Sequence, residues 1–275
     1  MTSRINTILI IGATSGLGEA FARRFHALGK TVIATGRRQA KLDALAQELK
    51  GLETRTFDIS DLDSLPANVE SLLKDFPNLD SVVINAGIQK NFSFFDPASI
   101  TSETIINEIN TDLTGPTLLV RLFVPHLAEL ARVGTKTNLF LTSSALAYAP
   151  FSFYPAYCPS KAGAHTLAKV LRQQLSNAPD EIKKNMNVVE IVPPYVDTGL
   201  DGEHRDAVND LQGGPEQAFP PMLLEEYIEK FFETLDQLEP DGSIKKEVAV
   251  GFGQLVVDTW RGSFGKLLEQ VGLPA

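Results

Sequence analysis

The fold is decided by residues 8–18, which read Ile8-Leu9-Ile10-Ile11-Gly12-Ala13-Thr14-Ser15-Gly16-Leu17-Gly18. The apolar run at 8–11 is typical of a buried parallel strand, and residues 19–25 have the spacing of a helix. Strand, glycine turn and helix in this order predict a dinucleotide-binding site. Gly12 can supply the tight turn, Gly16 lets the backbone approach a pyrophosphate, and Gly18 permits close packing of the helix on the strand. The alternative is a glycine-rich turn that binds no ligand.

The spacing of this motif is G-x-x-x-G-x-G rather than G-x-G-x-x-G. The phosphates of a dinucleotide would bind the amide groups and the positive dipole end of the helix. Thr14, Ser15 and Leu17 therefore join the three glycines as expected cofactor contacts.

A second strand, at 31–35, leads into Gly36-Arg37-Arg38. Proteins that bind NAD usually place an acidic residue here for the ribose 2′-hydroxyl, but the first carboxylate is Asp43. Guanidinium groups can bind a 2′-phosphate bidentately, so Arg37 and Arg38 predict a preference for NADP(H) over NAD(H). In the alternative they are solvated charges at a helix start, where positive charge is mildly unfavourable.

Strands and helices continue to alternate along the chain. Further apolar runs lie at 54–57, 81–84, 139–142, 187–192 and 247–251. This succession predicts an α/β fold with a doubly wound, Rossmann-type sheet in a single domain spanning residues 1–275. The ligand should lie beyond the carboxyl ends of the strands. There the sequence places Asp58 and Ile59, which could contact adenine, and the run Asn85-Ala86-Gly87.

The composition is that of an ordinary globular protein, with 43% hydrophobic and 21% charged residues among 275. The net charge of −9 argues against a nucleic-acid or anionic-membrane surface. Cys158 is the one cysteine, which excludes an internal disulfide and a thiolate zinc site. No apolar run approaches the ~18 residues of a membrane span, and no signal peptide is recognisable. We expect a cytoplasmic protein that binds a small-molecule substrate.

Tyr157 and Lys161 are four residues apart, so they share one face of a helix that Pro159 helps to start. A free tyrosine titrates near ~10, and a nearby cation lowers that pKa, so the pair could serve as a general acid or base. Ser144 follows the strand-like run 139–142, where its hydroxyl could hydrogen-bond a substrate oxygen. A Tyr-x-x-x-Lys pair also occurs by chance on many helices.

Taken together, these motifs resemble those of the short-chain dehydrogenase/reductase family over roughly the first 200 residues, and in particular a branch of bacterial and fungal reductases. The residues that carry the resemblance are Gly12-x-x-x-Gly16-x-Gly18, Asn85-Ala86-Gly87, Ser144, Tyr157-x-x-x-Lys161 and Pro193-Pro194-Tyr195-Val196-Asp197-Thr198. The resemblance implies seven mostly parallel strands with helices on both faces. It also implies hydride transfer between a nicotinamide and an alcohol or carbonyl carbon.

The resemblance also implies roles for individual residues. Tyr157 is the general acid/base, Ser144 orients the substrate oxygen, and Lys161 binds the nicotinamide ribose and lowers the tyrosine pKa. The further cofactor contacts that it implies are Asn85, Ala86, Gly87, Pro193, Val196 and Thr198.

Three residues depart from the family pattern. Ile11 stands where threonine is usual, and Pro194 replaces a glycine and stiffens its loop. Asp112 occupies the position of the catalytic asparagine, which in the family holds a helix irregularity and the water of a proton relay to the lysine. An ionised carboxylate accepts hydrogen bonds but cannot donate them, and it would pair with Lys161 if close enough. We expect an active enzyme with Asp112 at its catalytic site. The alternative is a dinucleotide-binding sensor or scaffold with weak or no turnover.

Residues 199–245 are expected to form a lid over the substrate, because 199–217 is polar, glycine-bearing and without periodicity. A helix at 222–238 follows. Aromatic residues in loops near the strand ends suggest an apolar or aromatic pocket, although core packing would also explain them. They are Phe92, Phe94, Phe95, Phe151, Phe153, Tyr154 and Tyr195. The expected substrate is a lipophilic ketone or the matching secondary alcohol.

The helices expected at 112–132 and 159–176 present broad apolar faces. In the family such helices form a dimer interface, so a homodimer or homotetramer is expected; alternatively they only cover the sheet. Pro116 and Pro125 should kink or interrupt the first helix. His165, one turn after Lys161, is interpreted as a core or interface histidine rather than a second base.

Overall fold

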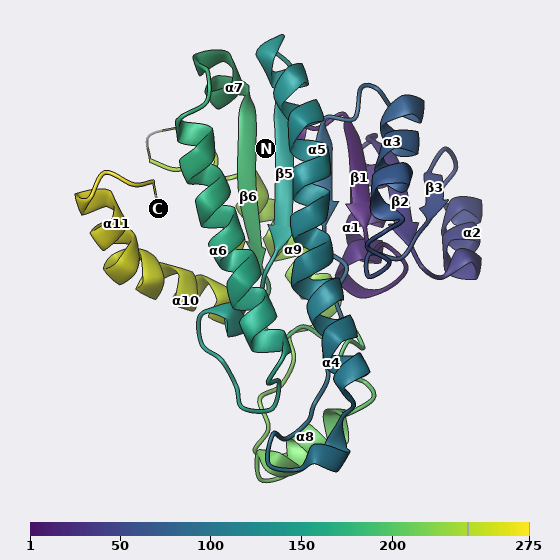
Figure 1. Ribbon diagram of the computed structural model, residues 1–275, viewed down its shortest axis with the longest axis vertical. Helices are drawn as coiled ribbons and strands as arrows, with labels where there is room; N and C mark the ends of the chain where they lie inside the picture. The colour runs from purple at the N-terminus through teal and green to yellow at the C-terminus, as the bar shows by residue number, and fades with distance from the viewer. Residues whose placement is uncertain (241, 275) are drawn as a thin grey trace.

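Seven strands form one sheet in which every neighbouring pair is parallel, in the order β3-β2-β1-β4-β5-β6-β7 (Figure 1). The computed structural model describes residues 1–240 and 242–274. The strands are β1 Thr7–Ile11, β2 Thr31–Gly36, β3 Glu53–Thr56, β4 Ser81–Ile84, β5 Thr137–Thr142, β6 Met186–Val192 and β7 Glu247–Ala249. The predicted doubly wound sheet is confirmed, and the order reverses between β1 and β4.

Helices connect the strands and cover both faces of the sheet (Figure 1). They are α1 Gly16–Ala27, α2 Gln39–Glu48, α3 Leu65–Asp75, α4 Ser102–Ile109, α5 Gly115–Arg132, α6 Tyr157–Ser176, α7 Asp180–Asn185, α8 Arg205–Leu211, α9 Leu224–Asp236, α10 Phe252–Trp260 and α11 Lys266–Gln270. Most strand boundaries lie within two residues of the prediction. None of the helices in the described part of the chain is long and apolar enough to cross a membrane.

The alternation of side chains along β1 divides the core into two layers. Ile8 and Ile10 pack with Phe21 of α1 and with residues of α9. Leu9 and Ile11 point to the opposite face, where they pack with residues of α3 and α5. Because successive strand residues face opposite sides, an uninterrupted apolar run such as 8–11 is buried on both. This burial fixes β1 in the core, and with it the position of the glycine turn that follows the strand.

The helix expected at 112–132 begins within a wider turn that includes Asp112, the position at which the family pattern implies a helix irregularity. A π-helical turn, Asn110–Thr114, separates α4 from α5, and the amide of Gly115 donates to the carbonyl of Asn110, five residues back. Pro116 has no amide hydrogen, so it cannot donate the regular α-helical hydrogen bond to the residue four positions back. The wider turn accommodates this missing bond. The interruption expected at Pro125 is wrong, because α5 continues through this residue.

The expected lid is partly helical. Within the stretch 199–217, predicted to have no periodicity, Arg205–Leu211 forms α8, which lies beyond the carboxyl ends of the strands (Figure 1). The chain then returns through Met222, which forms a parallel bridge with Val196, and enters α9. The segment is therefore anchored to the sheet before and after α8.

Candidate active site

The glycine turn joins β1 to α1 in the conformation that its glycines require. Gly12 has a φ of 93°, and a Cβ there would lie 2.6 Å from backbone atoms of Ala86. A Cβ on Gly18 would lie 2.0 Å from the carbonyl oxygen of Gly12, so only glycine permits this packing. No side chain caps the N terminus of α1. The first amides of that helix are therefore available to an anion.

Arg37 and Arg38 lie beside this turn. Arg38 donates to Oγ1 of Thr14 over 2.7 Å and to Oγ of Ser15 over 2.6 Å. Nη1 of Arg37 lies 3.5 Å from Oδ2 of Asp58. Arg38 thus contacts the glycine turn, while Arg37 contacts Asp58, and both follow β2 as the sequence predicted.

A cavity of about 990 Å³ runs along the carboxyl edge of the sheet and brings most of the predicted site residues together. Those that line it are Gly12, Thr14, Ser15, Gly16, Leu17, Arg37, Arg38, Ile59, Asn85, Ala86, Gly87, Ser144, Tyr157, Lys161, Pro193, Val196 and Thr198. Gly18, Asp58 and Asp112 do not line it. Gly18 packs against Gly12, and the other two lie behind the wall beside Arg37 and Lys161. The glycine cradle, the uncapped helix and the size of the cavity fit a dinucleotide.

Tyr157 and Ser144 come from two different elements, and both line this cavity. Tyr157 begins α6, and Ser144 caps the short 3₁₀ turn Ala145–Ala147, where its Oγ accepts the amide of Leu146 over 3.1 Å. Burial raises the pKa of Tyr157, and the charge of Asp112 raises it further, while a hydrogen bond with Ser144 opposes both. The pKa of Tyr157 is therefore raised, and the lowered value expected from the sequence is wrong.

The ammonium group of Lys161 interacts with two neighbours, the carboxylate of Asp112 and the ring of Tyr157. Its Nζ lies 3.7 Å from Oδ1 of Asp112, 5.4 Å from the centre of the Tyr157 ring, and donates to the carbonyl of Thr142 over 3.3 Å. The pairing foreseen between Asp112 and Lys161 is confirmed. It explains why the cation does not dominate the pKa of the phenol.

Asp112 lies in the π-helical turn and is fully buried. Its Oδ1 accepts the amide of Ile88 over 3.1 Å, while Oδ2 has no hydrogen-bond partner within the described residues. Burial raises the pKa of Asp112 to about 6, against the opposing effect of Lys161. The carboxyl therefore changes charge in the physiological range.

Sequence reasoning missed a second buried carboxyl beside it, that of Glu108 on α4. Its Oε1 accepts the amide of Lys90 over 2.9 Å, and its Oε2 is without a partner in the described part of the chain. Burial raises the pKa of Glu108 to about 7. Glu108 and Asp112 are four residues apart, the one signal that could have linked them, and together they hold the two alternate amides of the segment 88–90.

The wider end of the cavity is lined by aromatic side chains. Phe151, Phe153, Tyr154 and Tyr195 line it as predicted. Phe92, Phe94 and Phe95 do not; the first is buried elsewhere, and the other two are 72% and 100% exposed. Phe219 and Phe252 also line the cavity and were missed, because both lie far along the chain from the motifs. The rings of Phe219 and Phe151 are 6.0 Å apart.

Hydrogen bonds and ion pairs hold residues 201–205, at the start of α8, against neighbouring loops. The hydroxyl of Tyr195 donates to Asp201 over 2.5 Å, and Arg205 binds both Asp201 and Asp197 over 2.8 Å. Lys90 forms an ion pair with Glu203 over 2.5 Å. These contacts join the segment before α8 to the loops after β4 and β6.

A family model described as short chain dehydrogenase matches residues 6–209. The chain is 33% identical over 268 residues to an uncharacterized oxidoreductase, DltE, of Bacillus subtilis, which covers 97% of this chain and 96% of that protein. It is 32% identical over 214 residues to serine 3-dehydrogenase of Agrobacterium fabrum, with 76% of this chain and 80% of that protein covered.

Solved structures share the fold. A short-chain dehydrogenase from Sphingobium yanoikuyae in complex with NADPH gives a TM-score of 0.72 at 23% identity and covers 95% of each chain. A 3-ketoacyl-(acyl-carrier-protein) reductase from Brucella melitensis complexed with NADH gives 0.71 at 24% identity, covering 88% of this chain and 94% of that one.

Proposed function

The chain belongs to the short-chain dehydrogenase/reductase family, and we propose that it is an NADP-dependent enzyme that interconverts a carbonyl and a secondary alcohol of a small lipophilic or aromatic substrate. The observation that carries this proposal is the convergence of Ser144 and Tyr157 on the cavity that the glycine turn also lines. Members of an oxidoreductase family that use a nicotinamide dinucleotide need both parts in one cavity.

In the proposed reaction, the chain's own residues manage the substrate oxygen and its proton. Bound NADP(H) supplies or accepts hydride. Tyr157 donates its phenolic proton to the carbonyl oxygen in reduction and accepts it back in oxidation. A buried phenol with a raised pKa is fully protonated at neutral pH, which suits donation. Ser144 holds the same oxygen by a hydrogen bond.

Lys161 and Asp112 would return a proton to Tyr157 after each turnover. The carboxyl of Asp112, with a pKa near 6, can exist in both charge states at working pH. The ammonium of Lys161 lies between this carboxyl and the tyrosine ring. At the position of the family's asparagine, Asp112 would thus take up and release a proton itself, which an amide cannot do.

The preference for NADP(H) is supported by Arg37 and Arg38. Both line the cavity at the end of β2, and Asp58, the carboxylate beside Arg37, is not among the described residues that line it. The structural relatives hold NADPH in one case and NADH in another, so the choice for this chain depends on its own arginines.

The substrate class is supported by the aromatic wall. Phe151, Phe153 and Phe219 contribute apolar surface at the wide end of the cavity, which suits a lipophilic or aromatic ketone. A homodimer or homotetramer built on α5 and α6 stays a prediction.

The test is NADPH oxidation measured against a panel of alkyl, aryl and β-keto carbonyl compounds, with Tyr157→Phe as the matched control. Turnover of at least one ketone by the native chain, lost about 10²- to 10⁴-fold in the variant with unchanged NADPH binding, is expected. The rival function is a dinucleotide-binding sensor or scaffold, which Asp112 favours. Tight NADPH binding without turnover of any carbonyl would establish that rival.

A further inference from the structure

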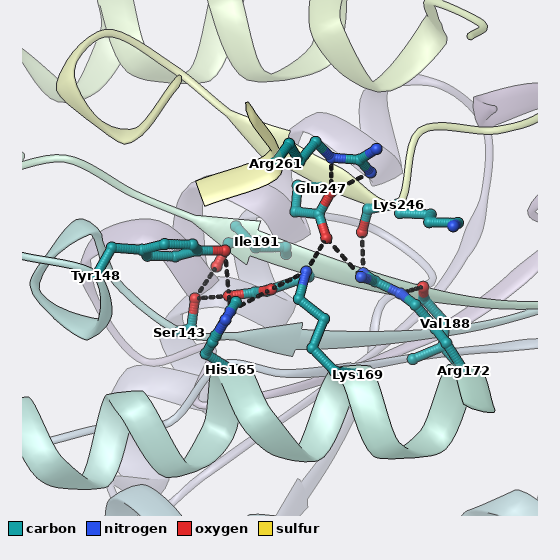
Figure 2. Close-up of polar contacts among 11 residues, drawn as sticks. Ser143, Tyr148, His165, Lys169, Arg172, Val188, Ile191, Lys246, Glu247 and Arg261 are labelled. Carbon is teal, nitrogen blue, oxygen red and sulfur yellow. Dashed lines mark hydrogen bonds and ion pairs between the residues drawn. The ribbon is translucent and has the colours of Figure 1, made fainter. Parts of the chain in front are cut away.

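A buried carboxylate on β6, Glu190, contacts residues of the two elements that carry Ser144 and Tyr157. Figure 2 shows its partners Ser143, Tyr148 and His165 close together. Ser143 donates to its Oε1 over 2.5 Å, and the hydroxyl of Tyr148 donates to the same oxygen over 3.1 Å. Nδ1 of His165 lies 3.0 Å from its Oε2. The side chain of Glu190 is 0% exposed.

Two of these donors flank the turn that Ser144 begins. Ser143 precedes Ser144, and Tyr148 follows the turn Ala145–Ala147. One oxygen of Glu190 therefore holds both ends of a turn whose first residue presents its hydroxyl to the cavity. The amide of Ser143 also donates to the carbonyl of Ile191 over 2.9 Å, which ties the same turn to β6.

The third donor comes from the helix of the acid/base. His165 lies on α6, two turns beyond Tyr157 and on the same face. Its ring packs against that of Tyr148, with 4.3 Å between centroids. The Ser144 turn and α6 thus meet on a single carboxylate.

We propose that Glu190 is a positioning residue that fixes the Ser144 hydroxyl relative to the Tyr157 phenol by holding Ser143, Tyr148 and His165 together. The proposal rests on the proposed oxidoreductase function. An apolar residue at this position of β6 would avoid the large cost of burying a carboxylate. The donors around Glu190 offset that cost, and their placement gives the carboxylate a geometric role that valine or leucine could not have.

The chain offers a matched control in Glu247, the residue paired with Glu190 on the neighbouring strand β7. Glu247 is also buried and binds Lys169 and Arg172, each over 2.5 Å, and Arg261 over 2.7 Å (Figure 2). Among the described contacts it reaches none of Ser143, Tyr148 and His165. The two acids share Lys169, whose Nζ also lies 3.7 Å from Oε2 of Glu190. Both acids should support stability, but only Glu190 should support the geometry of the reaction.

The experiment compares Glu190→Met, Glu190→Gln and Glu247→Met in the full chain. Glu190→Met removes the acceptor and is expected to lower kcat for the best ketone about 10- to 100-fold, with KM and the NADPH Kd within about threefold of native. Glu190→Gln keeps an oxygen that can accept from Ser143 and Tyr148, so its kcat should recover to within about fivefold. Glu247→Met should lower the melting temperature and leave kcat near the native value.

If Glu190→Met does not fold, the double variant Ser143→Ala, Tyr148→Phe removes only two hydroxyls and should lower kcat in the same way. Equal kcat in Glu190→Met and Glu247→Met, or native kcat in the double variant, would overturn the proposal. If the native chain reduces no carbonyl, the enzyme function fails, and crystal structures of the two Met variants decide the positioning role. A Ser144 Oγ displaced by about 1 Å or more only in Glu190→Met supports it, and an unmoved Oγ overturns it.

Discussion

The ammonium nitrogen of Lys161 lies 3.7 Å from Oδ1 of Asp112, and both side chains are almost entirely buried. Burial is the main reason why the pKa of Tyr157 is raised, and the negative charge of Asp112 raises it further. The charge of Asp112 therefore contributes to the pH at which the phenol loses its proton.

Asp112→Asn removes this negative charge and should lower the pKa of Tyr157. Alcohol oxidation rises with pH as Tyr157 loses its proton, so the rising limb of kcat should move to lower pH by about one unit. The measurement is the pH profile of alcohol oxidation with saturating NADP⁺. Asp61→Asn, an exposed aspartate on the loop before α3, is the control. A limb at the native pH in Asp112→Asn would mean that the two groups are not coupled.

Glu108→Gln should stabilise the protein at alkaline pH. The folded pKa of Glu108 is raised from 4.5 to about 7, so its stabilising effect is fully present below about 4.5 and lost as pH rises through 7. Gln keeps an oxygen for the Lys90 amide and carries no charge. We expect a gain of roughly 1–3 kcal/mol in unfolding free energy at pH 8 and little change near pH 4.5.

Urea unfolding at both pH values measures this difference, and Glu103→Gln, exposed on the same helix, is the control. A gain that is the same at both pH values would contradict the assignment of the penalty to the ionised carboxylate of Glu108.

Arg38→Ala should change cofactor choice. Arg38 reaches the glycine turn at Thr14 and Ser15, so it is placed to bind a ribose 2′-phosphate by charge-assisted hydrogen bonds. Loss of such bonds should raise the NADPH Kd about 10- to 100-fold and change the NADH Kd by less than about threefold. Titration of nucleotide fluorescence gives both constants, with Arg55→Ala, outside the cavity, for comparison. An equal loss of affinity for NADPH and NADH would mean that Arg38 supports the conformation of the glycine turn and does not bind the 2′-phosphate.

Gly18→Ala should separate α1 from β1. The new Cβ would lie 2.0 Å from the carbonyl oxygen of Gly12. This clash involves a backbone atom, which cannot move aside by changing a rotamer as a side chain can. We expect a loss of about 1–3 kcal/mol in stability together with weaker binding of both nucleotides. Gly262→Ala, which meets nothing within 4 Å and has no positive φ, should unfold at the native temperature or above it. Thermal unfolding of the two variants tests the packing.

The sequence predicted those parts of the fold and site that depend on local pattern. Apolar runs located most of the strands, because strands buried on both faces carry few polar residues; β3 is polar and only partly buried. The glycine turn was recognised from three residues that each have a steric task. Arg37, Arg38 and Ser144 were found because each follows a strand whose end could be placed. Tyr157 was found from its four-residue spacing to Lys161.

What the sequence could not predict depends on contacts between distant segments. Glu190 lies inside an apolar strand run, and its donors come from 25 to 47 residues away. Glu108 resembles an ordinary helix residue until its oxygen is seen on the Lys90 amide. Phe219 reaches the cavity only because the chain returns after α8. The expectation for the tyrosine pKa was wrong because burial of the phenol, the largest cause of the raised pKa, is a tertiary property that the motif does not show.

The buried polar residues of α6 also fix how this helix sits on the sheet. Lys161 meets Asp112, His165 meets Glu190, and Arg172 meets Glu247, each acid on a separate element. Sliding the helix by one residue would translate it 1.5 Å and rotate it by about 100°, which would break all three contacts at once. Apolar surfaces tolerate small slips of this kind. The axial register of α6, and with it the position of the Tyr157 phenol, is therefore set by three polar contacts as well as by apolar packing.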